Sequence, residues 1–175
     1  MNVFLVGPMG SGKSAVGRQL AQRLGLDFLD SDDEIEARTG VDISYIFERE
    51  GEAGFRQREA EVIDALSSRD GVLVSTGGGA ILDPLTRERL RARGRVVYLR
   101  TSVDQQLART RRSNDRPLLN NPDPRGTLER LFAERAPLYA EVAEIVVDTD
   151  GRKVKTVVEQ ICRQLGLEEG GEVSQ

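Results

Sequence analysis

The sequence has no histidine and a single cysteine, Cys162, among its 175 residues. A Ser-His-Asp triad and a histidine-ligated zinc site are therefore excluded, and so is a framework of internal disulfides. Cys162 falls in a stripe of apolar residues at helical spacing that runs from Val154 to Leu165. We expect it to be a packed core thiol and not a nucleophile, because buried thiols behave as small apolar groups.

Long hydrophobic runs are also absent. No apolar stretch approaches the roughly 18 residues that cross a membrane, and the first five residues look like a strand and not like a signal peptide. The net charge of −4 argues against non-specific binding to nucleic acid. These absences favour a cytoplasmic protein with no membrane or nucleic-acid partner. No pattern suggests a dimer surface, so we expect a monomer.

Lysine is scarce as well, with three lysines beside 22 arginines. Arginine binds carboxylate and phosphate groups through a planar fork, so single arginine positions are candidates for binding such groups. The chain length suits one compact domain, which we place at residues 1–166, followed by a polar tail at 167–175.

Five short apolar segments alternate with segments of helical spacing, which predicts an α/β fold with a five-stranded parallel sheet and helices on both faces. In such sheets ligands bind beyond the carboxyl ends of the strands. The expected strands are residues 2–6, 28–30, 71–75, 95–100 and 145–148. The expected helices lie near residues 15–24, 33–39, 43–50, 52–68, 84–93, 103–110, 126–140 and 153–166.

The first strand leads directly into Gly7-Pro8-Met9-Gly10-Ser11-Gly12-Lys13-Ser14, which fits the P-loop pattern Gly-x-x-x-x-Gly-Lys-Ser. The glycines let successive backbone N–H groups face a polyphosphate, and the next helix presents its positive end to it. Lys13 can reach the β- and γ-phosphates, while the Ser14 hydroxyl can bind Mg²⁺. The expected ATP contacts of this loop are Gly10, Ser11, Gly12, Lys13, Ser14 and Ala15.

Asp30 and Asp32 end the second strand, one residue apart. Both carboxylates can face the phosphate site if Ser31 faces away. The usual P-loop aspartate at the end of the third strand is missing, so we expect Asp30 to bind the metal ion, leaving Asp32 for a substrate hydroxyl. The alternative is a helix cap, with Ser31 or Asp32 opening the next helix.

Thr76-Gly77-Gly78-Gly79 follows the third strand and costs backbone entropy without giving any side-chain packing. This favours close approach of the main chain to a ligand, with a plain loop as the alternative. Arg56 and Glu59 lie three residues apart on one predicted helix, so the glutamate can hold the arginine toward an acid. Arg135 lies on an apolar helix face and requires an anionic partner. A structural ion pair is the alternative for both arginines.

Residues 111–124 are polar and interrupted by proline, which suggests a mobile lid carrying cations. Arg116 is the best candidate because Pro117 stiffens the chain after it. An arginine that arrives on closure stabilises the charge spread over a transferring phosphoryl group. The alternative is a solvated loop.

Taken together, these segments resemble the shikimate kinase family over nearly the whole chain. The motifs that carry the resemblance are the P-loop, Asp30-Ser31-Asp32, Phe55-Arg56-Gln57-Arg58-Glu59, Ser75-Thr76-Gly77-Gly78-Gly79, Arg116-Pro117-Leu118-Leu119 and Arg135-Ala136-Pro137-Leu138-Tyr139. The resemblance implies a fold like that of nucleoside monophosphate kinases. It also implies transfer of the ATP γ-phosphoryl group to the shikimate 3-hydroxyl, giving shikimate 3-phosphate and ADP on the route to chorismate and the aromatic amino acids.

The resemblance also implies roles for single residues. Shikimate would be bound by Asp32, Arg56, Gly78 and Arg135, between apolar walls formed by Phe47 and Phe55. Arg116 would contact the phosphates and Arg152 the nucleotide. The expected catalytic residues are then Lys13, Asp32 and Arg116, and the expected metal ligands of Mg²⁺ are Ser14 and Asp30.

Two other functions fit parts of the pattern. A related small-molecule kinase, such as one for gluconate, also has a P-loop and an acidic acceptor site. A non-catalytic nucleotide switch of the GTPase kind needs Asn-Lys-x-Asp, and Asn120-Asn121-Pro122-Asp123 has no lysine. The arginine lid and the second, acid-binding pocket favour a kinase.

Overall fold

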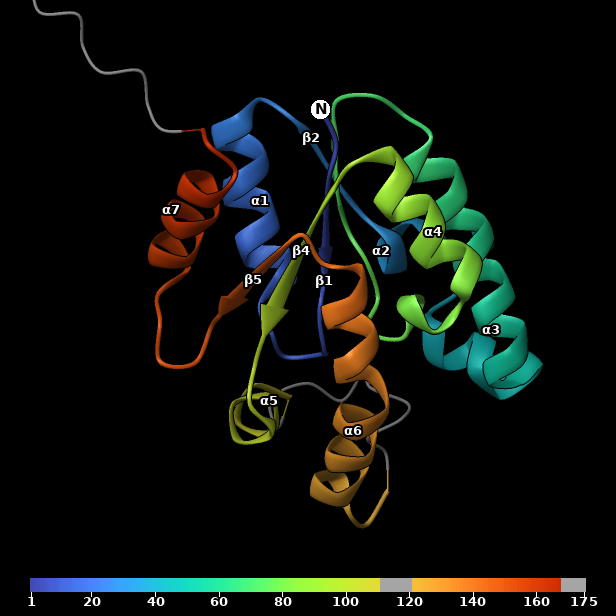
Figure 1. Ribbon diagram of the computed structural model, residues 1–175. Helices are drawn as coiled ribbons and strands as arrows, with labels where there is room; N and C mark the ends of the chain where they lie inside the picture. The colour runs from blue at the N-terminus through green and yellow to red at the C-terminus, as the bar shows by residue number, and fades with distance from the viewer. Residues whose placement is uncertain (111–120, 168–175) are drawn as a thin grey trace, which may run out of the picture.

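The computed structural model describes residues 1–110 and 121–167. Its centre is a parallel sheet with the strand order β2-β3-β1-β4-β5, which confirms the five-stranded sheet expected from the sequence. Figure 1 shows the strands side by side at the centre of the molecule. The strands are β1 (Val3–Val6), β2 (Asp27–Asp30), β3 (Val72–Ser75), β4 (Arg95–Arg100) and β5 (Ile145–Asp148).

Helices cover both faces of the sheet, as predicted (Figure 1). Helices α1 and α7 pack on one face, and α2, α3, α4 and α6 pack on the other. The helical elements are α1 (Lys13–Leu24), α2 (Ser31–Thr39), α3 (Ile43–Ser67), the 3₁₀ turn η1 (Ala80–Leu82), α4 (Pro84–Arg93), α5 (Val103–Thr110), α6 (Pro124–Val142) and α7 (Val154–Gln164).

The alternation of side chains along the strands builds a hydrophobic core on each face. On β1, Phe4 and Val6 join the core beneath α3 and α6, while Val3 and Leu5 join the core beneath α1 and α7. All four side chains are fully buried, as expected for a central parallel strand. Cys162 lies in the second core, which confirms that it is a packed thiol.

Several element boundaries differ from the expected ones. Residues 43–50 and 52–68 were expected to form two helices, and the structure joins them as α3 with a break at Gly51, whose φ is 71°. Helix α2 begins at Ser31 and not at residue 33, because Asp30 caps it. Helix α6 begins at Pro124, so the last residue of the predicted 111–124 lid is helical. The rest of that lid up to residue 120, and the tail from residue 168, lie outside the described residues.

Within residues 1–110 and 121–167, no helix has the length and apolar composition needed to span a membrane.

Candidate active site

The P-loop joins β1 to α1 at the carboxyl end of the sheet. Gly10 and Gly12 have φ values of 76° and 85°, the left-handed region that favours glycine, and Gly12 caps α1. The Lys13 ammonium donates to the carbonyl oxygens of Gly7 at 2.6 Å and Pro8 at 2.8 Å, so its charge lies over the loop. Ser14 and Ala15 are exposed in the first turn of α1.

A second cation reaches the P-loop, and sequence reasoning missed it. Arg109, in the last turn of α5, donates from Nη1 to the Gly10 carbonyl at 2.9 Å. The sequence did contain a signal for this contact: Arg109 lies near the end of a predicted helix, and that helix follows β4, the strand next to β1. Because parallel strands end at one edge of the sheet, that helix was bound to lie near the P-loop.

Asp30 connects the P-loop to the second strand. Its Oδ2 accepts a hydrogen bond from the Ser14 hydroxyl at 3.1 Å, and its Oδ1 accepts from the backbone N–H groups of Asp32 and Asp33. Asp30 therefore caps α2 itself, so the alternative in which Ser31 or Asp32 caps the helix is wrong. Ser31 faces away, as required, and its buried hydroxyl accepts from the Gly77 N–H at 3.0 Å.

The oxygens of Ser14 and Asp30 fit a hard divalent cation. Mg²⁺ in phosphoryl-transfer enzymes is typically bound through one or two carboxylates together with substrate phosphates and waters, so two protein oxygens suffice. Across the described ranges, no group of three or more histidine, cysteine, aspartate or glutamate residues could hold a metal ion by itself. The donor set is therefore that of a shared metal-phosphate site and not of an all-protein metal cage.

The glycine run after β3 lies against charged side chains on both sides. A Cβ at Gly77 would lie 2.6 Å from Glu59 Oε2 and 3.0 Å from Asp32 Oδ1. A Cβ at Gly79 would lie 2.6 Å from Nη1 of Arg56. At 2.6 Å a Cβ would force the charged side chain to move, so the glycines allow these groups to pack directly on the main chain.

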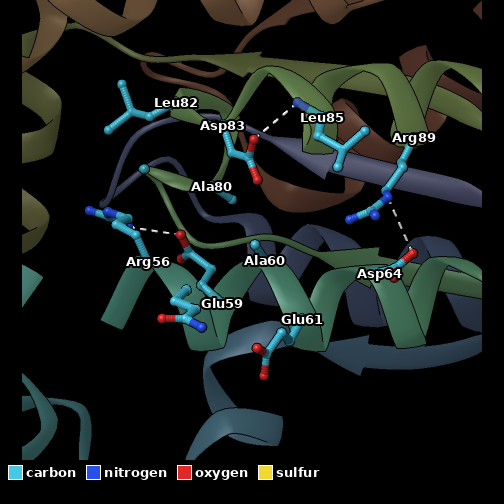
Figure 2. Close-up of a pocket in the computed structure, with 12 residues that line it drawn as sticks. Arg56, Glu59, Ala60, Glu61, Asp64, Ala80, Leu82, Asp83, Leu85 and Arg89 are labelled. Atoms are coloured by element: carbon cyan, nitrogen blue, oxygen red, sulfur yellow. Dashed lines mark hydrogen bonds and ion pairs between the residues drawn. The ribbon is translucent and has the colours of Figure 1, made fainter. Parts of the chain in front are cut away.

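Arg56 and Glu59 form the ion pair predicted from their spacing on α3. Nη1 of Arg56 lies 2.9 Å from Glu59 Oε1, a pair that Figure 2 shows beside η1, and its Nη2 lies 3.4 Å from Glu52. Burial raises the pKa of the Glu59 carboxyl to about 7, although the positive charge of Arg56 opposes that rise. In this pair Glu59 is almost fully buried, while the arginine side chain keeps 20% of its surface exposed.

A groove of about 580 Å³ opens beside this ion pair, between α3 and the segment from η1 to α4. Arg56 and Glu59 lie at one end of the groove and Asp64 and Arg89 at the other, as Figure 2 shows. The Arg89 guanidinium is held 3.4 Å from Asp64. Gly79, the last residue of the glycine run, lines the groove together with this ion pair.

Arg135 projects from α6 toward the same glycines. Its side chain is buried, and Nη1 lies 3.6 Å from the position of a Cβ at Gly78. Among the residues that the structure describes, no carboxylate forms an ion pair with Arg135, and its Nε has no hydrogen-bond partner. The charge of Arg135 acts on the Glu59 carboxyl and on the Tyr139 hydroxyl, but in the described part of the chain no carboxylate lies close enough to form the direct ion pair of the alternative reading.

Sequence reasoning also missed Tyr139, one turn beyond Arg135 on α6. Its hydroxyl donates to the Gly78 carbonyl. The spacing of four residues, which places both side chains on one helix face, was the available signal.

The structure thus brings Asp32, Arg56, Gly78 and Arg135 together around one loop, next to the P-loop. Phe47 and Phe55 also meet, with ring centroids 4.8 Å apart, and they pack against the core beneath this loop. Arg152 does not contact this group: its guanidinium donates to the Asp148 carbonyl at 3.1 Å and to the Gln160 side chain. Arg116 lies outside the described residues.

Comparison with known proteins identifies the family. The model of the shikimate kinase family matches residues 9–166. A shikimate kinase from Halorhodospira halophila is 60% identical over 163 residues, which cover 93% of this chain and 92% of that protein. The solved structure of Acinetobacter baumannii shikimate kinase in complex with shikimate is 49% identical, with a TM-score of 0.92, and covers 94% of this chain and 92% of that chain.

A gluconokinase from Sinorhizobium meliloti shares the fold alone, since it is 20% identical with a TM-score of 0.58 and covers 94% of this chain and 91% of that chain. The gluconate alternative therefore has no support beyond architecture, and the switch alternative has none. Kinases of the matched family use ATP, which implies a divalent metal ion. The chain belongs to the shikimate kinase family and is an enzyme that transfers a phosphoryl group from ATP to a hydroxyl of shikimate.

Proposed function

We propose that the residues gathered around Gly77–Gly79 form the shikimate site. In this proposal Arg56 and Arg135 bind the shikimate carboxylate, while Asp32 and the main chain at Gly78 bind ring hydroxyls. The two guanidiniums approach successive glycines of one loop, and Asp32 approaches the glycine before them. A small cyclic acid that carries hydroxyl groups can therefore contact all four residues at once.

The observation that carries this proposal is the burial of Arg135 without an ion pair among the described residues. A buried guanidinium is costly unless an anion neutralises it. A bound carboxylate supplies that anion in a planar, bidentate geometry. Glu59 contacts the Arg56 guanidinium through Nη1 only, at 2.9 Å.

We further propose that the P-loop binds the ATP phosphates through Gly10, Ser11, Gly12, Lys13, Ser14 and Ala15. The backbone N–H groups of the loop and the start of α1 supply positive partial charge, and the Lys13 ammonium adds a full charge. Arg109 lies close enough to the loop to join them. Arg116 and Arg152 are proposed as further nucleotide contacts on the family resemblance alone.

Ser14 and Asp30 are the proposed ligands of Mg²⁺, which when bound neutralises charge on the β- and γ-phosphates. Asp30 also fixes the start of α2 through its cap, and this orients Asp32 in the first turn. The proposed metal ligand Asp30 and the proposed acceptor residue Asp32 therefore lie in one short segment at the start of α2.

In the proposed reaction, Asp32 accepts a hydrogen bond from the 3-hydroxyl of shikimate and takes its proton as the phosphoryl group is transferred. The products are shikimate 3-phosphate and ADP. Because the transition state of phosphoryl transfer is loose, orientation of the hydroxyl contributes more than the basicity of Asp32. In this proposal Lys13 and Arg116 stabilise charge on the transferred group.

The protein is also proposed to be a monomer built as one domain over residues 1–166 and to work in the cytoplasm. The two cores share one central sheet, which supports a single folding unit. Light scattering after gel filtration tests the monomer, and a dimer mass at micromolar concentration contradicts it.

Isothermal titration calorimetry with shikimate tests the site directly. We expect Arg135→Gln to weaken shikimate binding about tenfold or more, since a charged hydrogen bond contributes about 1.5–3 kcal/mol, while ADP binding stays unchanged. Arg130→Gln, which changes another arginine of α6, is the matched control. Wild-type shikimate affinity in Arg135→Gln contradicts the proposed site.

A further inference from the structure

Tyr139 makes a contact that the proposed chemistry does not use. Its side chain is 2% exposed, and its hydroxyl donates to the carbonyl oxygen of Gly78, 61 residues away in the chain. This hydrogen bond links α6 directly to the loop that follows β3. A buried hydroxyl has many possible acceptors, and here the acceptor is the middle glycine of the proposed shikimate site.

Gly78 is held between two parts of the site. A Cβ added at Gly78 would lie 3.4 Å from the Met9 N atom and 3.7 Å from the Gly7 carbonyl oxygen of the P-loop, and 3.6 Å from Nη1 of Arg135. Because the peptide bond is planar and trans, fixing the Gly78 carbonyl also fixes the direction of the Gly79 N–H. The Tyr139 hydroxyl therefore sets the orientation of a whole peptide group in a run of residues that have no side chains to hold them.

Tyr139 is itself firmly placed. Its ring stacks on Tyr98 of β4, with ring centroids 4.9 Å apart and planes inclined by 29°. Strand β4 neighbours β1, which leads into the P-loop. Burial raises the pKa of the Tyr139 hydroxyl, although the charge of Arg135 opposes this, so the group stays protonated and can donate.

We propose that Tyr139 is a positioning residue for the acceptor: its hydroxyl holds the Gly78 carbonyl and so fixes the glycine run relative to Arg135 and the P-loop. Tyr139 and Arg135 lie one turn apart on α6, so one helix carries both the group that binds the acid and the group that holds the opposite wall. This inference rests on the proposed roles of Gly78 and Arg135 in binding shikimate.

The test compares Tyr139→Phe with Tyr98→Phe. Each change removes one buried hydroxyl from the same ring stack, but only the first removes the hydrogen bond to Gly78. For Tyr139→Phe we expect the KM and Kd for shikimate to rise about tenfold, with the KM for ATP changed less than about twofold. Tyr98→Phe is expected to leave both KM values near wild type.

Rescue separates the donor from the ring. With p-aminophenylalanine in place of Tyr139, an N–H donor returns to the same ring position, and we expect most of the shikimate affinity to return. Should Tyr139→Phe fail to fold, p-methylphenylalanine, which fills the volume of the hydroxyl without a donor, takes its place. Equal rises in the KM for shikimate and the KM for ATP, or no rescue by the amine, overturn the inference.

Arg135→Gln, measured in the same series, shows which proposal fails. If Arg135→Gln weakens shikimate binding and Tyr139→Phe does not, the positioning role is wrong and the proposed site stands. If neither variant weakens it, the site itself is wrong. If Tyr139→Phe alone weakens it, the carboxylate role of Arg135 is wrong, and the inference as stated falls with it.

Discussion

Asp30 accepts a hydrogen bond from the Ser14 hydroxyl with one carboxylate oxygen and caps helix α2 with the other. One side chain therefore connects the P-loop, the proposed metal site and the helix that carries Asp32. This arrangement leaves the segment after β2 little freedom to shift relative to the phosphates.

Asp30→Ala is predicted to raise the Mg²⁺ concentration for half-maximal activity about tenfold, because one of two protein oxygens near the metal is lost. It also removes a helix cap, at a cost of about 1 kcal/mol in the free energy of unfolding. Asp42→Ala is the matched control, since Asp42 caps α3 through the Tyr45 N–H. An unchanged Mg²⁺ requirement in Asp30→Ala, measured by titration of activity, removes Asp30 from the metal site.

Lys13→Ala is predicted to lower kcat by about 10²-fold or more, because a charge over the phosphate loop is lost where negative charge develops. The far-UV circular dichroism spectrum should stay unchanged. The chain has two other lysines, Lys153 and Lys155, which border or begin α7, and Lys155→Ala is the control. Turnover of Lys13→Ala at the wild-type rate contradicts the phosphate role.

Asp32→Asn keeps the size of the side chain and removes its charge. We expect kcat/KM for shikimate to fall about 10²–10⁴-fold, because an amide orients the hydroxyl less well than a carboxylate and cannot take its proton. Asp33→Asn, which changes the exposed neighbouring carboxylate, should retain activity. Steady-state kinetics at saturating ATP measures kcat/KM for shikimate in both variants. Equal losses of kcat/KM in Asp32→Asn and Asp33→Asn argue against an acceptor role for Asp32.

Gly79→Ala tests the close packing of Arg56 on the main chain. The φ of Gly79 is −98°, which alanine adopts without strain, so the methyl group acts only by displacing the guanidinium. We expect the KM for shikimate to rise about tenfold and the KM for ATP to stay constant. Gly40→Ala is the control. Its φ of 72° strains an alanine backbone, whereas no atom lies close enough to be displaced by the added methyl group. It should lose stability and keep the KM for shikimate.

Glu59 gives the protein a pH-dependent stability. Its folded-state pKa of about 7 lies above the ordinary value of 4.5, so between these values the folded protein binds more protons than the unfolded chain. The free energy of unfolding therefore falls as pH rises through this window. The contribution is complete below about pH 4.5, lost above about pH 7, and amounts to about 3 kcal/mol.

Urea denaturation of the wild type and Glu59→Gln at pH 5 and pH 8 measures this effect. The stability of the wild type relative to Glu59→Gln should be lower at pH 8 than at pH 5. Glu61→Gln, a change of a neighbouring carboxylate on the same helix, should show no such trend. A difference between wild type and Glu59→Gln that is the same at both pH values places the folded-state pKa near its ordinary value.

Local sequence was enough to predict the elements and several site residues. Alternation of apolar segments and helical spacing predicted the parallel sheet, and the spacing of three residues predicted the ion pair between Arg56 and Glu59. The apolar helix face predicted that Arg135 would be buried. These features depend on neighbours within one or two turns.

What could not be predicted depends on contacts between distant segments. The hydrogen bond from Gly77 to Ser31 spans 46 residues, and the one from Tyr139 to Gly78 spans 61. The glycine run suggested close approach of a ligand, but the structure shows that Glu59, Asp32 and Arg56 also require it. Periodicity reports which face of a helix is buried and cannot report which loop that face meets.

The most direct measurement of the central claim is release of ADP from Mg·ATP by the purified protein with shikimate, with gluconate and with no acceptor. The account predicts release with shikimate alone, and a phosphorylated product with the phosphate on the 3-hydroxyl. Equal release with gluconate, or with no acceptor, would contradict the assignment of Asp32, Arg56, Gly78 and Arg135 to a shikimate site.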